Sequence, residues 1–114
     1  MSESTTTAKT AAIRKALEDK KAEGIAVYDV RGKSSVTDET VAASATSVPH
    51  LRALSVAVQR AVRESCGEGA RISGDAESAW IVLDYFDAMV HLFLPDARAY
   101  YDIEALWRRG PSGG

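Results

Sequence analysis

Cysteine and histidine are scarce in this 114-residue chain, and their scarcity narrows the kinds of site it can hold. The single cysteine, Cys66, cannot form an internal disulfide, which fits a reducing cytoplasm. Its position favours a residue at a helix end over a catalytic thiol. The two histidines, His50 and His91, lie far apart in sequence and no cysteine pair accompanies them. A zinc site is therefore not indicated.

Long hydrophobic runs are absent as well. No stretch of 18 apolar residues occurs, so a membrane span is not expected. The opening residues, MSESTTTAKT, lack the apolar core of a secretory signal, and a cytoplasmic protein is expected. The length suits one hydrophobic core. We expect a flexible N-terminus over residues 1–7, a single domain over 8–107 and a flexible tail over 108–114.

An excess of basic charge is also missing. The chain has 16 acidic and 14 basic residues, a net charge of −2, which argues against a general nucleic-acid binder. The charge is unevenly placed, because residues 76–107 contain six acidic residues and a single base, Arg98. One end of the molecule should therefore be acidic and should favour a basic partner.

The motifs of common catalytic sites are incomplete. Gly32-Lys33-Ser34 matches the end of a phosphate-binding loop, but Val27 stands where that loop needs its first glycine. No D-x-D pair occurs that would let two carboxylates hold magnesium, and the G-x-S-x-G turn of serine hydrolases is absent. We therefore expect no enzymatic activity, no cofactor and no bound metal.

The hydrophobic pattern predicts an α/β domain with a mixed sheet and flanking helices. Ser47 is a good helix cap, Pro49 suits a first turn, and Gly67 ends that helix. Because a helix separates the first strands from the last ones, at least one parallel strand pair is expected. The expected order is a helix stopped by Gly24, a buried strand over 24–30, a weak strand over 40–45, a helix over 48–66, an edge strand over 69–73, a hairpin over 79–94, and a helix from Pro95 in which Tyr100, Ile103, Leu106 and Trp107 form the apolar stripe.

The hairpin carries the residues that most suggest a binding surface. If Tyr85 and Phe86 formed a two-residue turn, Asp84 and Asp87 would face each other, which is unfavourable for like charges. The alternative is a longer turn in which each aspartate accepts backbone N–H bonds. Trp80 could belong to the core or could be an exposed anchor. His91 is expected by default to be a packed or partly exposed strand residue.

These residues resemble the ribosomal silencing factor family (RsfS or Iojap-like proteins). The resemblance covers about residues 22–107 and rests on KKAEGIAVYDVRGKSSVTD, on the helix after ATS, and on WIVLDYFDAMVHLFLPDARAYYDIEALW. The family's tryptophan strand, D-x-x-D turn, V-H strand and closing Leu-Trp occur at this spacing. The matching positions are Trp80, Asp84, Asp87, Val90, His91, Arg98, Tyr101, Leu106 and Trp107.

The resemblance implies a nucleotidyltransferase-like topology without catalytic carboxylates, and a function without catalysis. Family members bind a large-subunit ribosomal protein, number fourteen (uL-type), and thereby block association with the small subunit. A homodimer is a further expectation from the resemblance. Arg108 and Arg109 in the tail would allow a contact with ribosomal RNA, and no membrane or specific nucleic acid is expected. The alternatives are a nucleotide-binding protein and a dimeric scaffold with another partner. The residues expected to bind the ribosomal protein are Trp80, Asp84, Tyr85, Phe86, Asp87 and His91.

Two positions depart from the family pattern. The family turn usually has glycine where this chain has Phe86, so the turn must be strained or widened, or it presents an extra apolar contact. The strand TDETVAASA is also smaller and more polar than is usual in the family, which weakens the expectation of that strand and of a dimer contact built on it.

Overall fold

A computed structural model describes residues 8–30 and 39–105 of the chain. Helices and strands alternate along it much as the hydrophobic pattern predicts. The elements in chain order are α1 (Ala8–Asp19), β1 (Glu23–Asp29), β2 (Glu39–Ser44), α2 (Val48–Cys66), β3 (Arg71–Asp75), the short 3-10 helix η1 (Ala76–Ser78), β4 (Trp80–Asp84), β5 (Ala88–Phe93) and α3 (Pro95–Tyr101).

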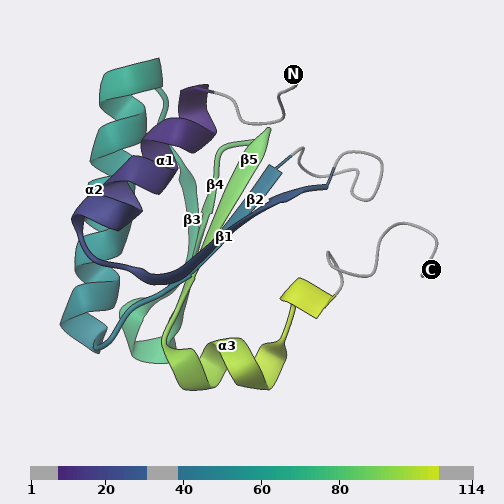
Figure 1. The fold of residues 1–114 in the computed structure, drawn as a ribbon. Helices are drawn as coiled ribbons and strands as arrows, with labels where there is room; N and C mark the ends of the chain where they lie inside the picture. The colour runs from purple at the N-terminus through teal and green to yellow at the C-terminus, as the bar shows by residue number, and fades with distance from the viewer. Residues whose placement is uncertain (1–7, 31–38, 106–114) are drawn as a thin grey trace.

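The strands form one mixed sheet in the order β1-β2-β5-β4-β3 (Figure 1). β2 and β5 are parallel, with Val41 opposite Val90, and the other neighbouring pairs are antiparallel. The helix α2 lies between β2 and the last three strands in the chain and provides the crossover that a parallel pair needs. The predicted α/β class, with a mixed sheet, is confirmed.

The two longer helices cover one face of the sheet, and α3 lies apart from them (Figure 1). Alternate residues of the central strands, such as Leu83 and Val90, point toward α1 and α2 and have no exposed surface. Helix α1 contributes Ile13 and Leu17 to this core. The opposite face carries Trp80, on which Tyr101 at the end of α3 packs.

Helix α2 begins and ends at the predicted residues. The Ser47 hydroxyl accepts a hydrogen bond from the His50 N–H at 3.2 Å, which satisfies a free donor of the first turn. Gly67 ends the helix at a φ of 70°, and its N–H donates to the Arg63 carbonyl. The side chains of α2 that face the sheet are Leu51, Leu54, Ser55, Val58 and Val62.

The first helix and the first strand correct two expectations. Helix α1 ends at Asp19, and Lys21 takes the left-handed conformation at a φ of 62°, so Gly24 is not the helix stop. Gly24 instead lies in β1, at an irregularity in its pairing with β2 and at a φ of 57°. Strand β1 is at the edge of the sheet and half-buried, whereas a fully buried strand was predicted.

Strand β2 shows the opposite deviation. Its small residues predicted a weak strand, yet all six residues are buried. The strand lies between β1 and β5, and alanines such as Ala42 and Ala43 fit there because both faces of the strand are covered. Burial, more than side-chain propensity, determines this strand.

The last helix is shorter than predicted. Helix α3 ends at Tyr101, because Asp102 adopts a left-handed conformation at a φ of 44°. Tyr100 is 82% exposed and does not belong to an apolar stripe. Several expectations lie outside the described residues: the rest of that stripe at Leu106 and Trp107, the turn at Gly32, and the chain ends over residues 1–7 and 108–114.

Buried charges attach the segment after α3 to the sheet. Glu104 accepts two hydrogen bonds from the Arg98 guanidinium, at 2.6 and 2.9 Å, and one from the Tyr28 hydroxyl at 2.5 Å. Arg98 also donates to the Ser44 hydroxyl at 3.0 Å. The network joins residues on β1, β2 and α3, so it fixes the C-terminal segment against the open face of the sheet.

Candidate partner-binding site at the β4–β5 turn

The turn between β4 and β5 lies one residue further along the chain than in the first of the two arrangements considered from the sequence. Asp84 pairs with Met89, and the Tyr85 N–H donates to the Ala88 carbonyl at 2.9 Å. The two central residues are therefore Phe86 and Asp87 instead of Tyr85 and Phe86. Asp84 and Asp87 do not form a cross-strand pair, so of the two arrangements considered from the sequence the facing one does not occur.

Phe86 occupies the conformation that the family pattern reserves for glycine. Its φ is 76°, and the Asp87 N–H donates to the Tyr85 carbonyl at 2.9 Å, which closes a three-residue γ-turn around it. The Asp84 carboxylate accepts the Phe86 N–H at 2.8 Å, as an aspartate in a turn commonly does. The Phe86 side chain is 84% exposed. Strain and an exposed aromatic ring thus coincide at one residue.

Asp87 is bound within the molecule by a lysine of the first helix. The Lys9 ammonium lies 2.6 Å from an Asp87 carboxylate oxygen and 2.6 Å from a Glu68 oxygen. Burial alone would lower the pKa of Lys9, but the two carboxylates outweigh it and the net pKa is raised. About half of the Asp87 side chain is still exposed. Lys9 therefore positions the turn and neutralises part of its charge.

The sequence analysis did not identify Lys9 as a buried residue of the site, although the spacing of α1 indicates it. Lys9, Ile13 and Leu17 are spaced by four residues and therefore lie on the same face of α1. A lysine on the apolar face of a helix indicates a buried ion pair, and Lys9 is only 8% exposed.

Tyr85 does not reach the surface of the turn. It is 3% exposed and packs in the core under α1 and α2, with the Lys9 nitrogen 6.0 Å from its ring centre. Burial raises the pKa of the Tyr85 hydroxyl, which has no hydrogen-bond partner among the described residues. Its expected exposure at the tip is corrected: Tyr85 supports the turn from beneath.

Trp80 and His91 lie on the other face of the sheet, in an aromatic cluster. Trp80 is half-buried, and its ring centre lies 5.3 Å from that of Phe93 and 4.9 Å from that of Tyr101. Its indole N–H donates to His91 Nδ1 at 3.3 Å. Burial lowers the pKa of His91 to about 4, although Glu104 acts to raise it. His91 is thus a packed, neutral strand residue, as the sequence indicated by default.

The exposed residues Phe86 and Asp87, together with the partly exposed Asp84, define the candidate site. Asp84, Phe86 and Asp87, which we call the turn patch, form an aromatic tip flanked by two carboxylates. Beside them lies a hollow of about 430 Å³, lined by Glu68, Gly69, Arg71, Asp84, Tyr85 and Phe86. In the parts of the chain that are described, no group of three or more His, Cys, Asp or Glu side chains could hold a metal ion.

Within residues 8–30 and 39–105, no helix combines the length and apolarity that a bilayer crossing requires. The fold defines an α/β protein with a mixed five-stranded sheet and flanking helices.

Comparison with known proteins identifies the family. The model of the family described as "Ribosomal silencing factor during starvation" matches residues 3–113. A ribosomal silencing factor from Halalkalibacterium halodurans is 31% identical over 97 residues, which cover 85% of this chain and 83% of that protein. This chain therefore belongs to the ribosomal silencing factor family, a family of translation regulators, as its resemblance implied.

Solved structures and an organellar relative agree with this assignment. A crystal structure of a protein from Chromobacterium violaceum superimposes with a TM-score of 0.77 at 35% identity, covering 87% of this chain and 82% of that one. The mouse protein named "Mitochondrial assembly of ribosomal large subunit protein 1" is 30% identical over 94 residues, which cover 80% of this chain and 41% of the mouse protein.

Proposed function

We propose that this protein binds the large ribosomal subunit and blocks, by its bulk, association with the small subunit. Membership of the silencing factor family supports the ribosomal target, and the name of the mouse relative supports the large subunit. The proposed mechanism needs affinity and position but no catalytic turnover. Such a protein would act in the cytoplasm, where bacterial subunits associate.

The proposed partner is ribosomal protein number fourteen, on the face of the large subunit that meets the small one. The observation that carries the assignment of the surface is Phe86, which is 84% exposed at a strained φ of 76°. A strained, exposed aromatic residue contributes little to folding and suits an interface anchor. Asp84 and Asp87 would contact lysine or arginine on this basic protein.

The other predicted contact residues have different parts in the proposal. The half-buried Trp80 lies at the end of β4 away from the turn, so it would contribute a contact separate from the turn patch. Tyr85 and His91 are 3% and 7% exposed, so they would support the surface from within. The homodimer expected from the resemblance would use an edge strand, β1 or β3, because these strands have an unpaired side. Sedimentation of the purified chain measures whether it is a monomer or a dimer.

Two substitutions at the turn test the assignment. Phe86→Gly removes the ring but suits the positive φ, so the chain should fold at least as stably and bind large subunits about 30-fold more weakly, a reduction of about 2 kcal/mol. Asp84→Asn keeps the acceptor for the Phe86 N–H while removing the charge. This substitution should weaken binding to large subunits by only about 0.5–1 kcal/mol, as the loss of a charge at the rim of an interface does. Co-sedimentation with purified large subunits measures both.

Tyr100→Ala is the matched control, because Tyr100 is an equally exposed aromatic residue (82%) on α3. It should leave binding unchanged. The mechanism is tested by mixing purified subunits with saturating wild-type protein in a sucrose gradient. Full association of the subunits under those conditions would rule out the steric mechanism, and equal binding of Phe86→Gly and wild type would rule out the turn patch.

A further inference from the structure

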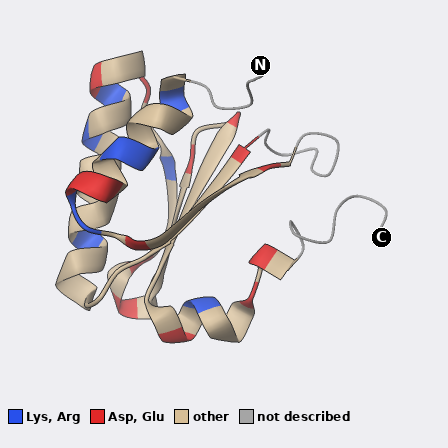
Figure 2. Ribbon diagram, viewed as in Figure 1, with Lys and Arg blue, Asp and Glu red and all other residues tan. Residues whose placement is uncertain are grey.

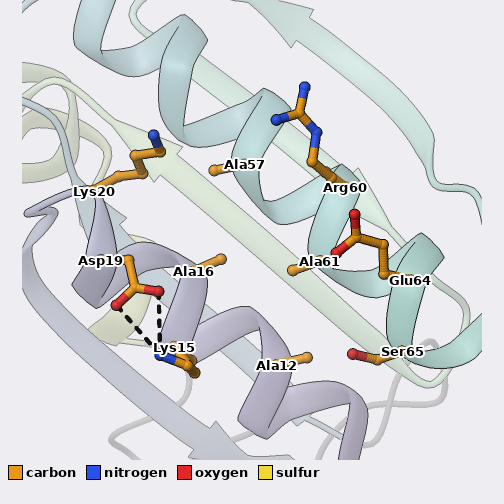
Figure 3. Close-up of a pocket in the computed structure, with 10 residues that line it drawn as sticks. All are labelled: Ala12, Lys15, Ala16, Asp19, Lys20, Ala57, Arg60, Ala61, Glu64 and Ser65. Atoms are coloured by element: carbon orange, nitrogen blue, oxygen red, sulfur yellow. Dashed lines mark hydrogen bonds and ion pairs between the residues drawn. The ribbon is translucent and has the colours of Figure 1, made fainter.

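A groove runs between α1 and α2 on the side of the helices that faces away from the sheet (Figure 3). One hollow of about 360 Å³ shares Lys20, Ala57 and Arg60 with a second hollow of about 330 Å³, so the two form a continuous depression. Alanines form most of its floor, and the exposed side chain of Val56 also lines it. The alanines are Ala12, Ala16, Ala53, Ala57 and Ala61.

The helical layer around this groove is basic, although the chain as a whole is acidic. Residues 10–21 and 48–66 contain seven basic and three acidic side chains, a net charge of +4, against −2 for the full chain. Figure 2 shows Lys and Arg gathered on the two helices, while Asp and Glu lie mainly along the strands and around α3. The basic side chains thus lie mainly on the helical layer, apart from the acidic strands and α3.

Two of the cations at the groove are available to a ligand. Lys20 and Arg60 line both hollows, are exposed, and have no ion-pair partner among the described residues. The other basic residues of the rim are engaged: Lys15 pairs with Asp19 at 3.2 Å, and Arg52 pairs with Glu77. Two acidic side chains line the same rim: Asp19, which pairs with Lys15, and Glu64, which would repel an anion.

We propose that this groove contacts the phosphate backbone of ribosomal RNA. The inference rests on the proposed function and deepens it, because it assigns a second contact to the same complex. Lys20 and Arg60, the two rim cations without an ion-pair partner in the described part of the chain, favour an anionic backbone over a neutral helix, which would cover them without neutralising their charge. With a net charge of −2, the chain would bind RNA weakly by itself, so this contact would orient a protein held by the turn patch.

The test compares Lys20→Ala/Arg60→Ala with wild type in binding to purified large subunits over a range of salt concentrations. The logarithm of the binding constant K falls as the logarithm of the salt concentration rises. Removing one cation that neutralises a phosphate makes this fall less steep, by about 0.7–0.9 in the slope. The double variant should therefore bind about tenfold more weakly at low salt, with a slope smaller by about 1.5. Glu64→Gln is the matched control on the same rim, and it should bind severalfold more tightly, which general damage to the helices would not produce.

Two further measurements separate this inference from the proposed function. Binding to isolated ribosomal protein fourteen should be the same for the double variant and wild type, while Phe86→Gly should weaken it. At low salt, wild type should bind a generic RNA duplex more tightly than the double variant does. Either of two results would overturn the RNA assignment even if the turn patch were confirmed. The first is that wild type does not bind the duplex. The second is that the double variant binds large subunits more weakly but with the same salt slope as wild type.

Discussion

At the scale of single residues, Phe86 and Lys9 depart from what their neighbourhoods in the sequence favour. Phe86 has the positive φ that glycine adopts freely, and Lys9 lies on the buried face of α1. The strain at Phe86 was predictable from the missing glycine. The ion pair of Lys9 with Asp87 joins residues 78 positions apart, so only the folded chain specifies that partner.

We expect Lys9→Met to destabilise the protein by about 1–2 kcal/mol, because Lys9 is buried while its two carboxylate partners are about half exposed. Urea unfolding measures the change. Lys15→Met is the matched control: its ion pair with Asp19 is exposed, and removing that pair should change the free energy of unfolding by less than about 0.5 kcal/mol. Equal effects of the two substitutions would contradict a positioning role for Lys9.

The same ion pairs predict a dependence on alkaline pH. The pKa of Lys9 is raised above its ordinary 10.5 in the folded chain. The stabilisation by Lys9 is therefore complete below pH 10.5 and disappears as the pH rises through the folded pKa.

At the scale of elements, β2 and β1 show where local patterns mislead. The alanine-rich β2 is central and the more apolar β1 is at an edge, because strand position depends on pairing partners elsewhere in the chain. The caps of α2 were predictable, since Ser47 and Gly67 act on the backbone within a few residues of themselves.

Gly74 in β3 provides a test at this scale. Its φ is 75°, and a Cβ atom there would lie 2.3 Å from the Trp80 carbonyl oxygen, a backbone atom that cannot move independently. Gly74→Ala should lower the free energy of unfolding by about 2–4 kcal/mol by separating β3 from β4. Ser73→Ala, at an exposed neighbouring position, should change it by less than about 0.5 kcal/mol. A mild effect of Gly74→Ala, measured by urea unfolding, would show that β3 can shift at little cost in stability.

At the scale of the whole molecule, buried titratable groups link stability to acid. His91 is neutral in the fold with a pKa of about 4, below the 6.5 of an unfolded histidine. Between pH 6.5 and 4 the unfolded chain binds a proton that the folded chain does not. His91 should therefore reduce the free energy of unfolding by up to about 3 kcal/mol over that range and have no effect above it.

The measurement is urea unfolding of wild type and His91→Gln at pH 7 and pH 4.5. The carboxylates of the chain contribute to both proteins, so the difference between the two pH dependences isolates His91. The variant should lose less stability on acidification than wild type does. Identical changes in the two proteins would show that His91 is not the acid-sensitive group.

The sequence by itself determined the α/β class, the bounds of α2, the hairpin and the family, because these depend on periodicity, caps and motifs carried by neighbouring residues. Only the tertiary structure decided the register of the β4–β5 turn, the burial of Tyr85 and the pairing of Asp87 with Lys9. These features depend on contacts between distant segments, and the packing of α1 and α2 on one face of the sheet brings those segments together.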